Sequence, residues 1–354
     1  MEIFKSLAED QHEQIIFCSD KVAKLRGIIA IHDTTLGPAI GGVRMFPYKT
    51  DEEALKDVLL LSRAMTYKAA AVGINLGGGQ GVIIGDPSKD KNELLLRAFG
   101  RFVQGLNGRY ITAEDLGTTV DDMEIVRYET KHVVGLSRAL GGSGDPGPVT
   151  AIGLQSGLLA CVEKVLNKKS LEGVSVAIQG MGHVGYHLAK ELKASGSRLI
   201  VADLLSEKAE KARMEFGAEV VNPDEIFQVE ADVFSPCALG GVINAQTVDR
   251  FKAKIIAGAA NNQLADDKYG DILHNKEIVY APDFVIGAGG MINVANELGG
   301  YVKEKAIKQA TGIYDIMKKI LEISKESNIP TYKAANILAK ARIAEVKKFR
   351  QRHA

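Results

Sequence analysis

The chain has 354 residues, which at about 150 residues per domain predicts two globular domains. Its 44 basic residues balance its 44 acidic residues, and 46% of the residues are hydrophobic, as is typical of globular proteins. Because the net charge is zero, the composition does not point to a nucleic-acid or membrane partner, and we expect neither. Glycine is enriched, with 37 residues in clusters, as is typical of turns and of backbone close to a ligand.

Cysteine usage and the N-terminal residues bear on the cellular compartment. Cys18, Cys161 and Cys237 lie far apart, lack CxxC spacing and are odd in number, which argues against disulfides and predicts a cytoplasmic protein. The first residues, MEIFKSLAED, have no apolar stretch behind a positive start, so we expect no signal peptide. No uninterrupted apolar run reaches the roughly 20 residues that span a bilayer, so we expect no membrane helix.

The first 71 residues predict two strands and a long helix. The runs QIIFCSD and GIIAIHDTT predict strands, which are broken by the turn-rich segment TTLGPAIGG. Residues 50–71 have the apolar period of an amphipathic helix, with Thr50 or Asp51 as its N-cap. Lys68 lies along the apolar side of this helix, where it either extends past the apolar stripe to water or projects its charge into a cleft.

A glycine-rich segment and a strand that ends in two carboxylates come next. INLGGGQGVIIGDP predicts a glycine-rich turn over Gly77–Gly81 that leads into a strand. After a further helix, the predicted strand RYITA ends at Glu114 and Asp115. Since adjacent side chains of a strand point to opposite faces, at most one of these carboxylates faces a given cleft. The following helix is expected to begin at Thr119, which has capping-box spacing to Asp122.

The second half of the chain has the pattern of a parallel sheet. Residues 138–150, RALGGSGDPGPVT, are rich in glycine and proline and predict a connection between domains. A strand, turn, helix and strand then form a βαβ unit, and more short strand-like runs follow it. The last helix comes after Pro330, and its residues 340–352 carry a local charge of +5, which fits a solvated helix or a contact with an acidic surface of another subunit. We predict an α/β fold with a Rossmann-type second domain and a substrate in the cleft between the domains.

The glycine motif GMGHVG predicts a dinucleotide site. It follows the strand VSVAI, opens a helix, and is followed by Asp203 at the end of the next strand, 21 residues after the middle glycine. The glycines allow a tight turn, approach of backbone N–H groups to a pyrophosphate and close helix packing. A carboxylate at Asp203 would bind ribose hydroxyls and repel a 2′-phosphate, so we predict NAD; a glycine turn in a cofactor-free domain is the alternative. The predicted contacts are Gly180, Met181, Gly182, His183, Val184 and Gly185.

The histidines are scattered along the chain. His183 and His187 lie one turn apart on the predicted helix, but the sequence shows no cluster of acidic or cysteine ligands with them. We therefore predict no metal site.

Motifs along essentially the whole chain keep the order and spacing of one enzyme family. They are MTYKAA, INLGGG, RYITAEDLGTT, PVTAIG, SPCALGG, AGAANNQL, YAPDFVI and GGMINVANEL. Together they resemble the glutamate/leucine/phenylalanine/valine dehydrogenase family. The resemblance implies reversible NAD-linked oxidative deamination of an L-amino acid to a 2-oxo acid and ammonia, by a homo-oligomer. It also implies a substrate and oligomerisation domain over residues 1–137, with a returning C-terminal helix at about 331–354, and an NAD-binding domain over 138–330.

The resemblance implies roles for individual residues. Lys68 matches the lysine that binds the substrate carboxylate, and Asp115 matches the carboxylate that exchanges a proton with the substrate nitrogen. Apolar residues are expected to line the side-chain pocket and to favour an aliphatic substrate: Ile40, Ala113, Met291 and Val294. Further expected substrate contacts are Gly77, Gly78 and Asn262, and further expected cofactor contacts are Thr150, Cys237, Ala238 and Asn261.

Two positions depart from the family pattern. The family's GGGK segment supplies a lysine that acts as general base on the attacking water, and here that position is Gln80. An amide neither exchanges a proton near neutral pH nor carries charge. Because general acid–base catalysis contributes about 10² to 10⁴ in rate, we expect a slowed enzyme. The second departure is Gly287, where the family has asparagine, so a polar side chain is missing near the reaction centre.

Several interpretations of Gln80 stay open. Gln80 and Asp115 could be the candidate catalytic pair of a slow enzyme, or Asp115 could act through a water held by the Gln80 amide. Alternatively, the chain is a paralogue that binds NAD and an amino acid without turnover, as a sensor or structural partner. A Rossmann dehydrogenase with a substrate other than an amino acid is a further alternative.

Overall fold

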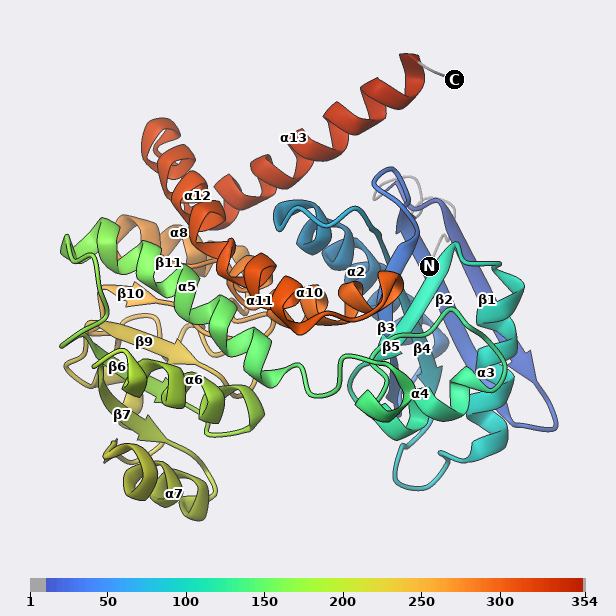
Figure 1. Cartoon of the computed structure of the whole chain (residues 1–354), viewed down its shortest axis with the longest axis horizontal. Coiled ribbons are helices and arrows are strands. Elements are labelled where there is room, and N and C mark those ends of the chain that lie inside the picture. The colour runs from blue at the N-terminus through green and yellow to red at the C-terminus, as the bar shows by residue number, and fades with distance from the viewer. Residues whose placement is uncertain (1–10, 353–354) are drawn as a thin grey trace. The chain divides into compact units, whose positions relative to one another are not determined.

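The computed structural model describes residues 11–352, which form two compact units (Figure 1). The first unit holds the chain up to Asp145, the segment Val294–Val302 and the chain from Ala339; the second holds Pro146–Asn293 and Lys303–Leu338. The predicted boundaries were 138 and about 331, so the chain enters the second unit later than expected and makes one additional return, at 294–302. The roles assigned to these ranges stay predictions. The stretch MEIFKSLAED, in which we expect no signal peptide, lies outside the described residues.

The first unit contains a five-stranded sheet with the strand order β1-β2-β4-β3-β5. Its strands are β1 (Gln14–Asp20), β2 (Leu25–Asp33), β3 (Ala39–Phe46), β4 (Gly77–Ile84) and β5 (Tyr110–Glu114). β2 runs antiparallel to β1 and β4, whereas β3 runs parallel to both β4 and β5. The carboxyl ends of β3, β4 and β5 therefore lie at the same edge of the sheet, where ligands of α/β proteins bind.

Helices cover both faces of this sheet. They are α2 (Asp51–Ala71), α3 (Glu93–Gly105), α4 (Val120–Arg127) and the short η1 (Arg138–Leu140). The alternation of β2 decides which side chains meet which helix: Ile28 and Ala30 pack with α2, whereas Ile29 and Ile31 pack with α3 and α4. We call the two sides of the sheet the α2 face and the α3 face.

The predicted helix caps of this unit are confirmed. The Thr50 side chain accepts a hydrogen bond from the backbone N–H of Glu53 at the start of α2. Thr119 and Asp122 form a capping box at the start of α4.

Two segments expected to be turns contribute to strands. The run Gly77–Gly81 forms the first part of β4, in the centre of the sheet, and TTLGPAIGG leads directly into β3. A Cβ at Gly78 would lie 2.2 Å from the Thr66 hydroxyl oxygen of α2, and a Cβ at Gly41 would lie 1.7 Å from the Gly79 carbonyl oxygen. Glycine has a low strand propensity, but only glycine permits these close approaches of helix and strand, so tertiary packing overrides propensity.

The second unit contains a parallel sheet with the strand order β11-β10-β9-β6-β7-β8. Its strands are β6 (Ser175–Gln179), β7 (Arg198–Ala202), β8 (Glu219–Val220), β9 (Val233–Pro236), β10 (Ile255–Ile256) and β11 (Val279–Tyr280). This is the strand order of a Rossmann fold, as predicted. The order reverses between β6 and β9, and the carboxyl ends of these strands are where such folds bind ligands.

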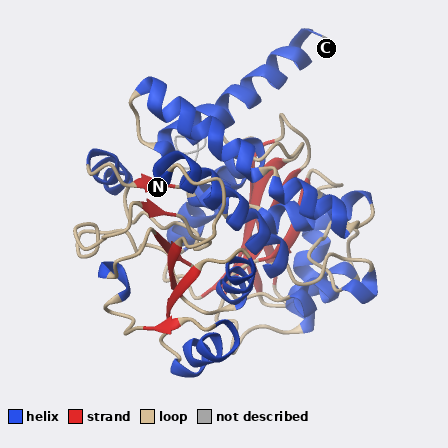
Figure 2. Ribbon diagram, turned by 60° about the vertical axis from the view of Figure 1, so that its left-hand side comes forward, coloured by secondary structure: helices blue, strands red, loops and turns tan. Residues whose placement is uncertain are grey.

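Helices make up most of the remainder of the molecule (Figure 2). The second unit contributes α5 (Gly147–Leu166), α6 (His183–Ala194), α7 (Ser206–Phe216), η2 (Ile226–Gln228), α8 (Asp267–Asn275), α9 (Asp283–Ile286), α11 (Lys303–Thr311) and α12 (Ile313–Ser327). Two further helices, α10 (Gly289–Ala295) and α13 (Thr331–Arg352), belong partly to each unit, and η3 (Asn296–Gly299) belongs to the first.

One described helix, α5, is long and apolar enough by length and composition to cross a membrane, although polar and charged residues interrupt its apolar run. Its most apolar window is 56% buried, and Leu154 and Leu158 are completely buried. This burial is typical of the core helix of a globular unit.

Candidate active site and dinucleotide-binding loop

Most of the strand residues predicted for the site share the α2 face of the first unit, whereas Gly77, the first residue of β4, has the opposite alternation. Val82 of β4 packs with α2, so Gln80 and Gly78, at the same alternation, lie on that face. Ile40 lies opposite Gly78 in the ladder, and Ala113 lies opposite the residue two positions beyond Ile40. Directly opposed residues of neighbouring strands point to the same face, so the ladder brings these positions together.

Asp115 directly follows β5 and contacts Gln80. The Gln80 Nε2 donates a hydrogen bond to Asp115 Oδ2 at 2.9 Å. Gln80 is only 3% exposed, whereas the Asp115 side chain is 30% exposed, so the carboxylate is partly accessible. Thr118 fixes the backbone here, because its hydroxyl oxygen accepts from the Asp115 N–H at 2.9 Å and lies 2.8 Å from the Val43 carbonyl. The two candidate catalytic residues therefore form one hydrogen-bonded pair.

Arg44 of β3 is a second donor to the same carboxylate oxygen. Its Nε lies 3.1 Å from Asp115 Oδ2, and its Nη1 lies 3.1 Å from Asp57 Oδ2, which also accepts a hydrogen bond from the Tyr48 hydroxyl. Burial opposes the charge of Arg44, but the Asp115 and Asp57 carboxylates more than offset it and raise the pKa of Arg44 above its ordinary value. The Oδ1 of Asp115 receives no hydrogen bond from a described residue. One oxygen of Asp115 is therefore held by two donors, whereas the other is not.

Lys68 lies in the last turn of α2 and is half-buried. The face of α2 that packs on β4 contains Ser62 and Thr66, which approach Gly78 closely. At 100° per residue, Lys68 lies about 140° around the helix from the middle of this face, so the expectation that it lies along the apolar side is not met. Its role as a carboxylate ligand stays a prediction.

Two predicted pocket residues, Ala113 and Val294, both flank Gly135. A Cβ at Gly135 would lie 4.0 Å from both the Ala113 Cβ and the Val294 Cγ1. Glu297 holds this region together, because its carboxylate accepts hydrogen bonds from the backbone N–H groups of Gly135 at 3.0 Å and Ser143 at 2.7 Å. The return segment at 294–302 thus places one apolar side chain, that of Val294, beside Gly135.

In the second unit, the predicted dinucleotide-binding loop joins β6 to α6. Gly180 has a φ of +94°, which favours glycine, and a Cβ at Gly185 would lie 2.0 Å from the Gly180 carbonyl oxygen. Gly182 is the N-cap of α6; a Cβ there would meet no atom within 4 Å, and no side chain caps the helix. An open helix N-terminus at the switch point of the sheet fits a pyrophosphate.

Other predicted cofactor residues surround this loop. Asp203 directly follows β7, and its Oδ2 accepts the Met181 N–H at 2.7 Å, so its carboxylate lies beside the loop. Cys237 follows β9, and a Cβ at Gly180 would lie 2.8 Å from the Ala238 Cβ. The group formed by the loop, Asp203 and the end of β9 therefore fits a dinucleotide.

The remaining predicted residues of the second unit fall in two places. Thr150 of α5 packs on the N-terminal end of α10, where a Cβ at Gly289 would lie 2.5 Å from the Thr150 Cα. Met291 follows in α10 and is 6% exposed. Asn261 and Asn262 follow β10, and Asn262 adopts a φ of +52°, a left-handed conformation that asparagine tolerates well.

Gly287, the second departure from the family pattern, directly follows α9. A Cβ at this position would lie 2.9 Å from the Asp283 carbonyl oxygen. An asparagine here would therefore require the local backbone to shift.

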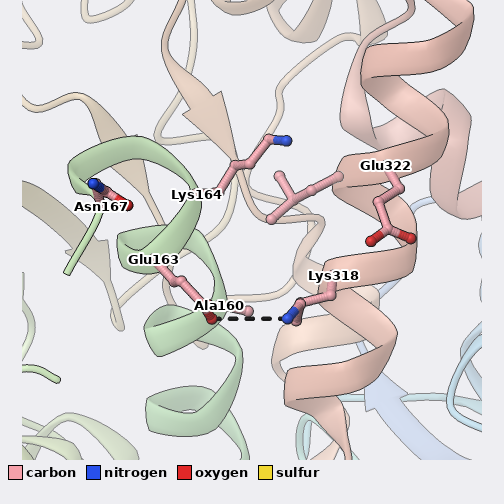
Figure 3. Close-up of a pocket in the computed structure, with 7 residues that line it drawn as sticks. Ala160, Glu163, Lys164, Asn167, Lys318 and Glu322 are labelled. Carbon is pink, nitrogen blue, oxygen red and sulfur yellow. Dashed lines mark ion pairs between the residues drawn. The ribbon is translucent and has the colours of Figure 1, made fainter. Parts of the chain in front are cut away.

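A pocket of about 260 Å³ lies elsewhere in the second unit, between α5 and α12 (Figure 3). Its lining includes the ion pair of Lys318 and Glu163, with N and O 3.9 Å apart, and also Lys164 and Glu322. None of the predicted site residues lines it. It is therefore separate from the dinucleotide-binding loop.

Arg44 and Glu297 were missed at the sequence level. Arg44 could have been found if residues 39–46 had been predicted as a strand, because alternation then places it on the same face as Ile40. Glu297 gives no comparable signal, since the backbone N–H groups that donate to it become apparent only when the return segment packs on the first unit.

Comparisons with known proteins agree with this arrangement. The family model described as Glu/Leu/Phe/Val dehydrogenase, dimerisation domain, matches residues 12–132, and the model described as Glutamate/Leucine/Phenylalanine/Valine dehydrogenase matches residues 201–351. The chain is 56% identical to leucine dehydrogenase of Geobacillus stearothermophilus over 350 residues, 99% of this chain and 95% of that protein. The chain belongs to the glutamate/leucine/phenylalanine/valine dehydrogenase family. It is an enzyme of this family, whose members depend on NAD or NADP.

Other members of the family are similar in sequence and in structure. L-tryptophan dehydrogenase of Nostoc punctiforme is 49% identical over 349 residues, which are 98% of each chain. The crystal structure of L-tryptophan dehydrogenase from this organism matches with a TM-score of 0.87 and 47% identity, covering 98% of this chain and 99% of that chain. The hetero-hexameric glutamate dehydrogenase of Thermus thermophilus, at 22% identity and a TM-score of 0.78, covers 98% of this chain and 96% of that chain and shares the fold.

Proposed function

We propose that the protein catalyses the reversible NAD-dependent oxidative deamination of a branched-chain aliphatic L-amino acid. In this reaction the amino acid, water and NAD⁺ give the 2-oxo acid, ammonium, NADH and a proton. The observation that carries the proposal is the bonded pair of Asp115 and Gln80 on the sheet face covered by the helix of Lys68, in a chain of this family. Leucine dehydrogenase is the name of a relative that is 56% identical over 350 residues.

Substrate binding is assigned to one positive charge and two apolar side chains. The Lys68 ammonium binds the substrate carboxylate, because an ammonium and a carboxylate form a charge-assisted hydrogen bond. Ala113 and Val294, which both flank Gly135, accept an aliphatic side chain. A charged side chain such as that of glutamate would lose its hydration there without gaining a partner, so it would be rejected.

Proton transfer is assigned to Asp115. Its Oδ2 is held by Gln80 and Arg44, while its Oδ1 exchanges the proton of the substrate nitrogen. Gln80 orients Asp115 and has no proton to exchange, so activation of the attacking water also falls to Asp115. With one group in both roles, we expect catalysis about 10² to 10⁴ times slower than with a dedicated base.

The cofactor is assigned to the loop at 180–185. Bound NAD would accept the hydride from the substrate α-carbon. The α6 N-terminus at Gly182 binds the pyrophosphate, and Asp203 accepts hydrogen bonds from the ribose hydroxyls. A 2′-phosphate beside Asp203 would be repelled, which favours NAD over NADP.

We further propose a homo-oligomeric, cytoplasmic enzyme. The match to a dimerisation domain over residues 12–132 supports self-association. Cys18, Cys161 and Cys237 are all unpaired, as is typical of a reducing compartment.

Gln80 itself favours a second candidate function. An amide at the position of the family's general base fits a paralogue that binds NAD and an amino acid without turnover. Such a protein would bind L-leucine in calorimetry and form no NADH on long incubation.

The deciding experiment measures NADH formation with L-leucine, L-valine and L-isoleucine at alkaline pH, beside the Asp115→Asn variant. We expect slow turnover with these amino acids, and loss of turnover in the variant. Absence of NADH with every amino acid, together with calorimetric binding, would favour the non-catalytic paralogue. NADH from 2-hydroxy acids and not from amino acids would show a dehydrogenase of another substrate class.

A further inference from the structure

A side chain of the last helix, Arg342, caps the C-terminal end of α2. Its Nη1 donates to the carbonyl oxygens of Ala69 at 3.3 Å, Ala70 at 3.1 Å and Ile74 at 2.9 Å. Its Nη2 donates to the Gly73 carbonyl at 3.0 Å and to Asn75 Oδ1 at 2.6 Å. One half-buried guanidinium therefore binds five acceptors that precede it by 267 to 273 residues.

These acceptors lie at the negative end of α2. The last carbonyls of a helix lack intrahelical partners, and the aligned peptide dipoles place partial negative charge there. Among the described residues Arg342 makes no ion pair, so its positive charge is compensated by main-chain dipoles. Burial lowers the pKa of Arg342, but a guanidinium stays charged at physiological pH.

The contacts extend from the helix into the chain reversal that follows it. Ala69 and Ala70 belong to the last turn of α2, whereas Gly73, Ile74 and Asn75 lie between α2 and β4. Gly73 has a φ of +77°, which turns the chain back toward the sheet. The guanidinium thus joins the helix end to the segment that leads into β4.

Lys68 immediately precedes the first of these acceptors. Its neighbour Tyr67 has a second contact with α13, because the Lys340 Nζ lies 6.0 Å from the centre of the Tyr67 ring. Ala339 of the same helix is completely buried. The part of α13 at 339–342 therefore packs against the turn of α2 that carries Lys68.

We propose that Arg342 is a positioning residue for Lys68, and that it acts by fixing the last turn of α2 to the segment before β4. The proposal rests on the carboxylate-binding role assigned to Lys68 under the proposed function. Without the guanidinium, up to four carbonyls lose a charged donor, the last turn of α2 frays, and the Lys68 ammonium samples positions that do not match the substrate carboxylate. Substrate affinity then falls, whereas proton transfer at Asp115 and the dinucleotide-binding loop are unaffected.

The test compares Arg342→Met, Arg342→Lys and the control Lys348→Met, which makes the same kind of change at an exposed position of α13. We expect Arg342→Met to raise KM for L-leucine about three- to tenfold, which corresponds to the usual strength of a charge at a helix end. We expect kcat and KM for NAD to change less than twofold. Arg342→Lys should restore about half of the loss on a logarithmic scale, because it keeps the charge but not the planar fork. Lys348→Met should match the unmodified protein.

Hydrogen exchange of the peptide covering 66–76 provides a readout that does not depend on activity. It should be faster in Arg342→Met, intermediate in Arg342→Lys and unchanged in Lys348→Met. An unchanged KM for L-leucine in Arg342→Met, or equal losses of kcat and kcat/KM, would overturn the proposal. If Arg342→Met does not fold, KM for L-leucine and hydrogen exchange of the same peptide in Arg342→Lys decide whether the proposal holds. An unmodified protein with no turnover would instead refute the proposed function.

Discussion

Replacing Gln80 by lysine adds a cation beside Asp115 in a charge cluster that the structure describes in detail. Arg44 already contacts both Asp57 and Asp115, so the three charged groups sum to −1. Gln80 donates to the same Asp115 oxygen from 2.9 Å and is 3% exposed. The Gln80→Lys variant would therefore place an ammonium at the point where the net charge of the cluster is negative.

The magnitude follows from two opposing free energies. At about 4 Å and an effective dielectric constant of about 20, the attraction between lysine and Asp115 is about 4 kcal/mol. Removing the ammonium from water costs several kcal/mol, so the two terms nearly cancel and the fold should be retained. The gain appears in catalysis, because the variant regains a titratable group next to Asp115. We expect kcat for L-leucine to rise by about 10² to 10⁴, or about 3 to 5 kcal/mol of activation free energy.

The assay is steady-state NADH formation from L-leucine over a range of alkaline pH, with thermal unfolding as a check on folding. The matched control is Gln80→Met, which removes the hydrogen bond to Asp115 and adds no charge. We expect this control to lower kcat about tenfold, because it releases one of the two donors to Asp115 Oδ2. A folded Gln80→Lys protein with kcat within about threefold of the unmodified enzyme would refute the reasoning. An equal rise in both variants would show that charge is not the cause.

Arg44→Met should lower kcat for L-leucine about 10- to 100-fold with little change in KM for NAD, because Asp115 loses its charged donor. Asp203→Ser should bring kcat/KM for NADP to within about tenfold of that for NAD, since the carboxylate that repels a 2′-phosphate is removed. Glu297→Ala should lower the free energy of unfolding in urea by about 1 to 3 kcal/mol, because buried backbone N–H groups lose their acceptor. Burial raises the pKa of the Cys161 thiol to about 12, so alkylation of the native thiol at about pH 8 should be at least about 10²-fold slower than in urea.

Three of these expectations have a separate check. The control for Arg44→Met is Arg26→Met, which removes an ion pair with Asp51 whose side chains are 62% and 69% exposed, so this variant should behave like the unmodified enzyme. For Cys161, the unfolded thiol releases its proton above about pH 9 while the buried thiol stays protonated, so stability should fall as the pH rises from about 9 toward 12. Rapid alkylation of the native thiol would contradict the assignment of Cys161 as buried, and a preference for NAD over NADP that Asp203→Ser does not change would contradict the role of Asp203.

Local sequence patterns predicted the elements whose environment follows from their neighbours in the chain. The period of α2 and its Thr50 cap, the capping box at Thr119 and the βαβ unit around Gly180–Gly185 are all confirmed. The caps depend on interactions within a few residues, and the βαβ unit joins strands that are neighbours in the chain. The glycine run that begins at Gly77 was wrongly expected to be a turn, because its strand conformation depends on α2 and β3, which pack closely against it.

The candidate site likewise has parts that the sequence predicted and parts that depend on tertiary packing. The order of motifs was enough to name Lys68, Gln80 and Asp115, and the family is confirmed over essentially the whole chain. Side-chain alternation also restricted the site to one of the two carboxylates at 114 and 115. The pairing of Gln80 with Asp115 was beyond these arguments, because Gln80 lies in β4 and Asp115 follows β5, and β3 separates these strands in the sheet.

The sequence by itself determined the fold class, the family, the dinucleotide motif and the departure at position 80, since all of these are properties of residue types at fixed spacing. Only the tertiary structure decided which side chains donate hydrogen bonds to Asp115 and which side chain caps the C-terminus of α2. Arg44 reaches Asp115 from another strand, and Arg342 reaches α2 from the far end of the chain. Such contacts join residues tens to hundreds of positions apart, and their geometry exists only after the elements have packed.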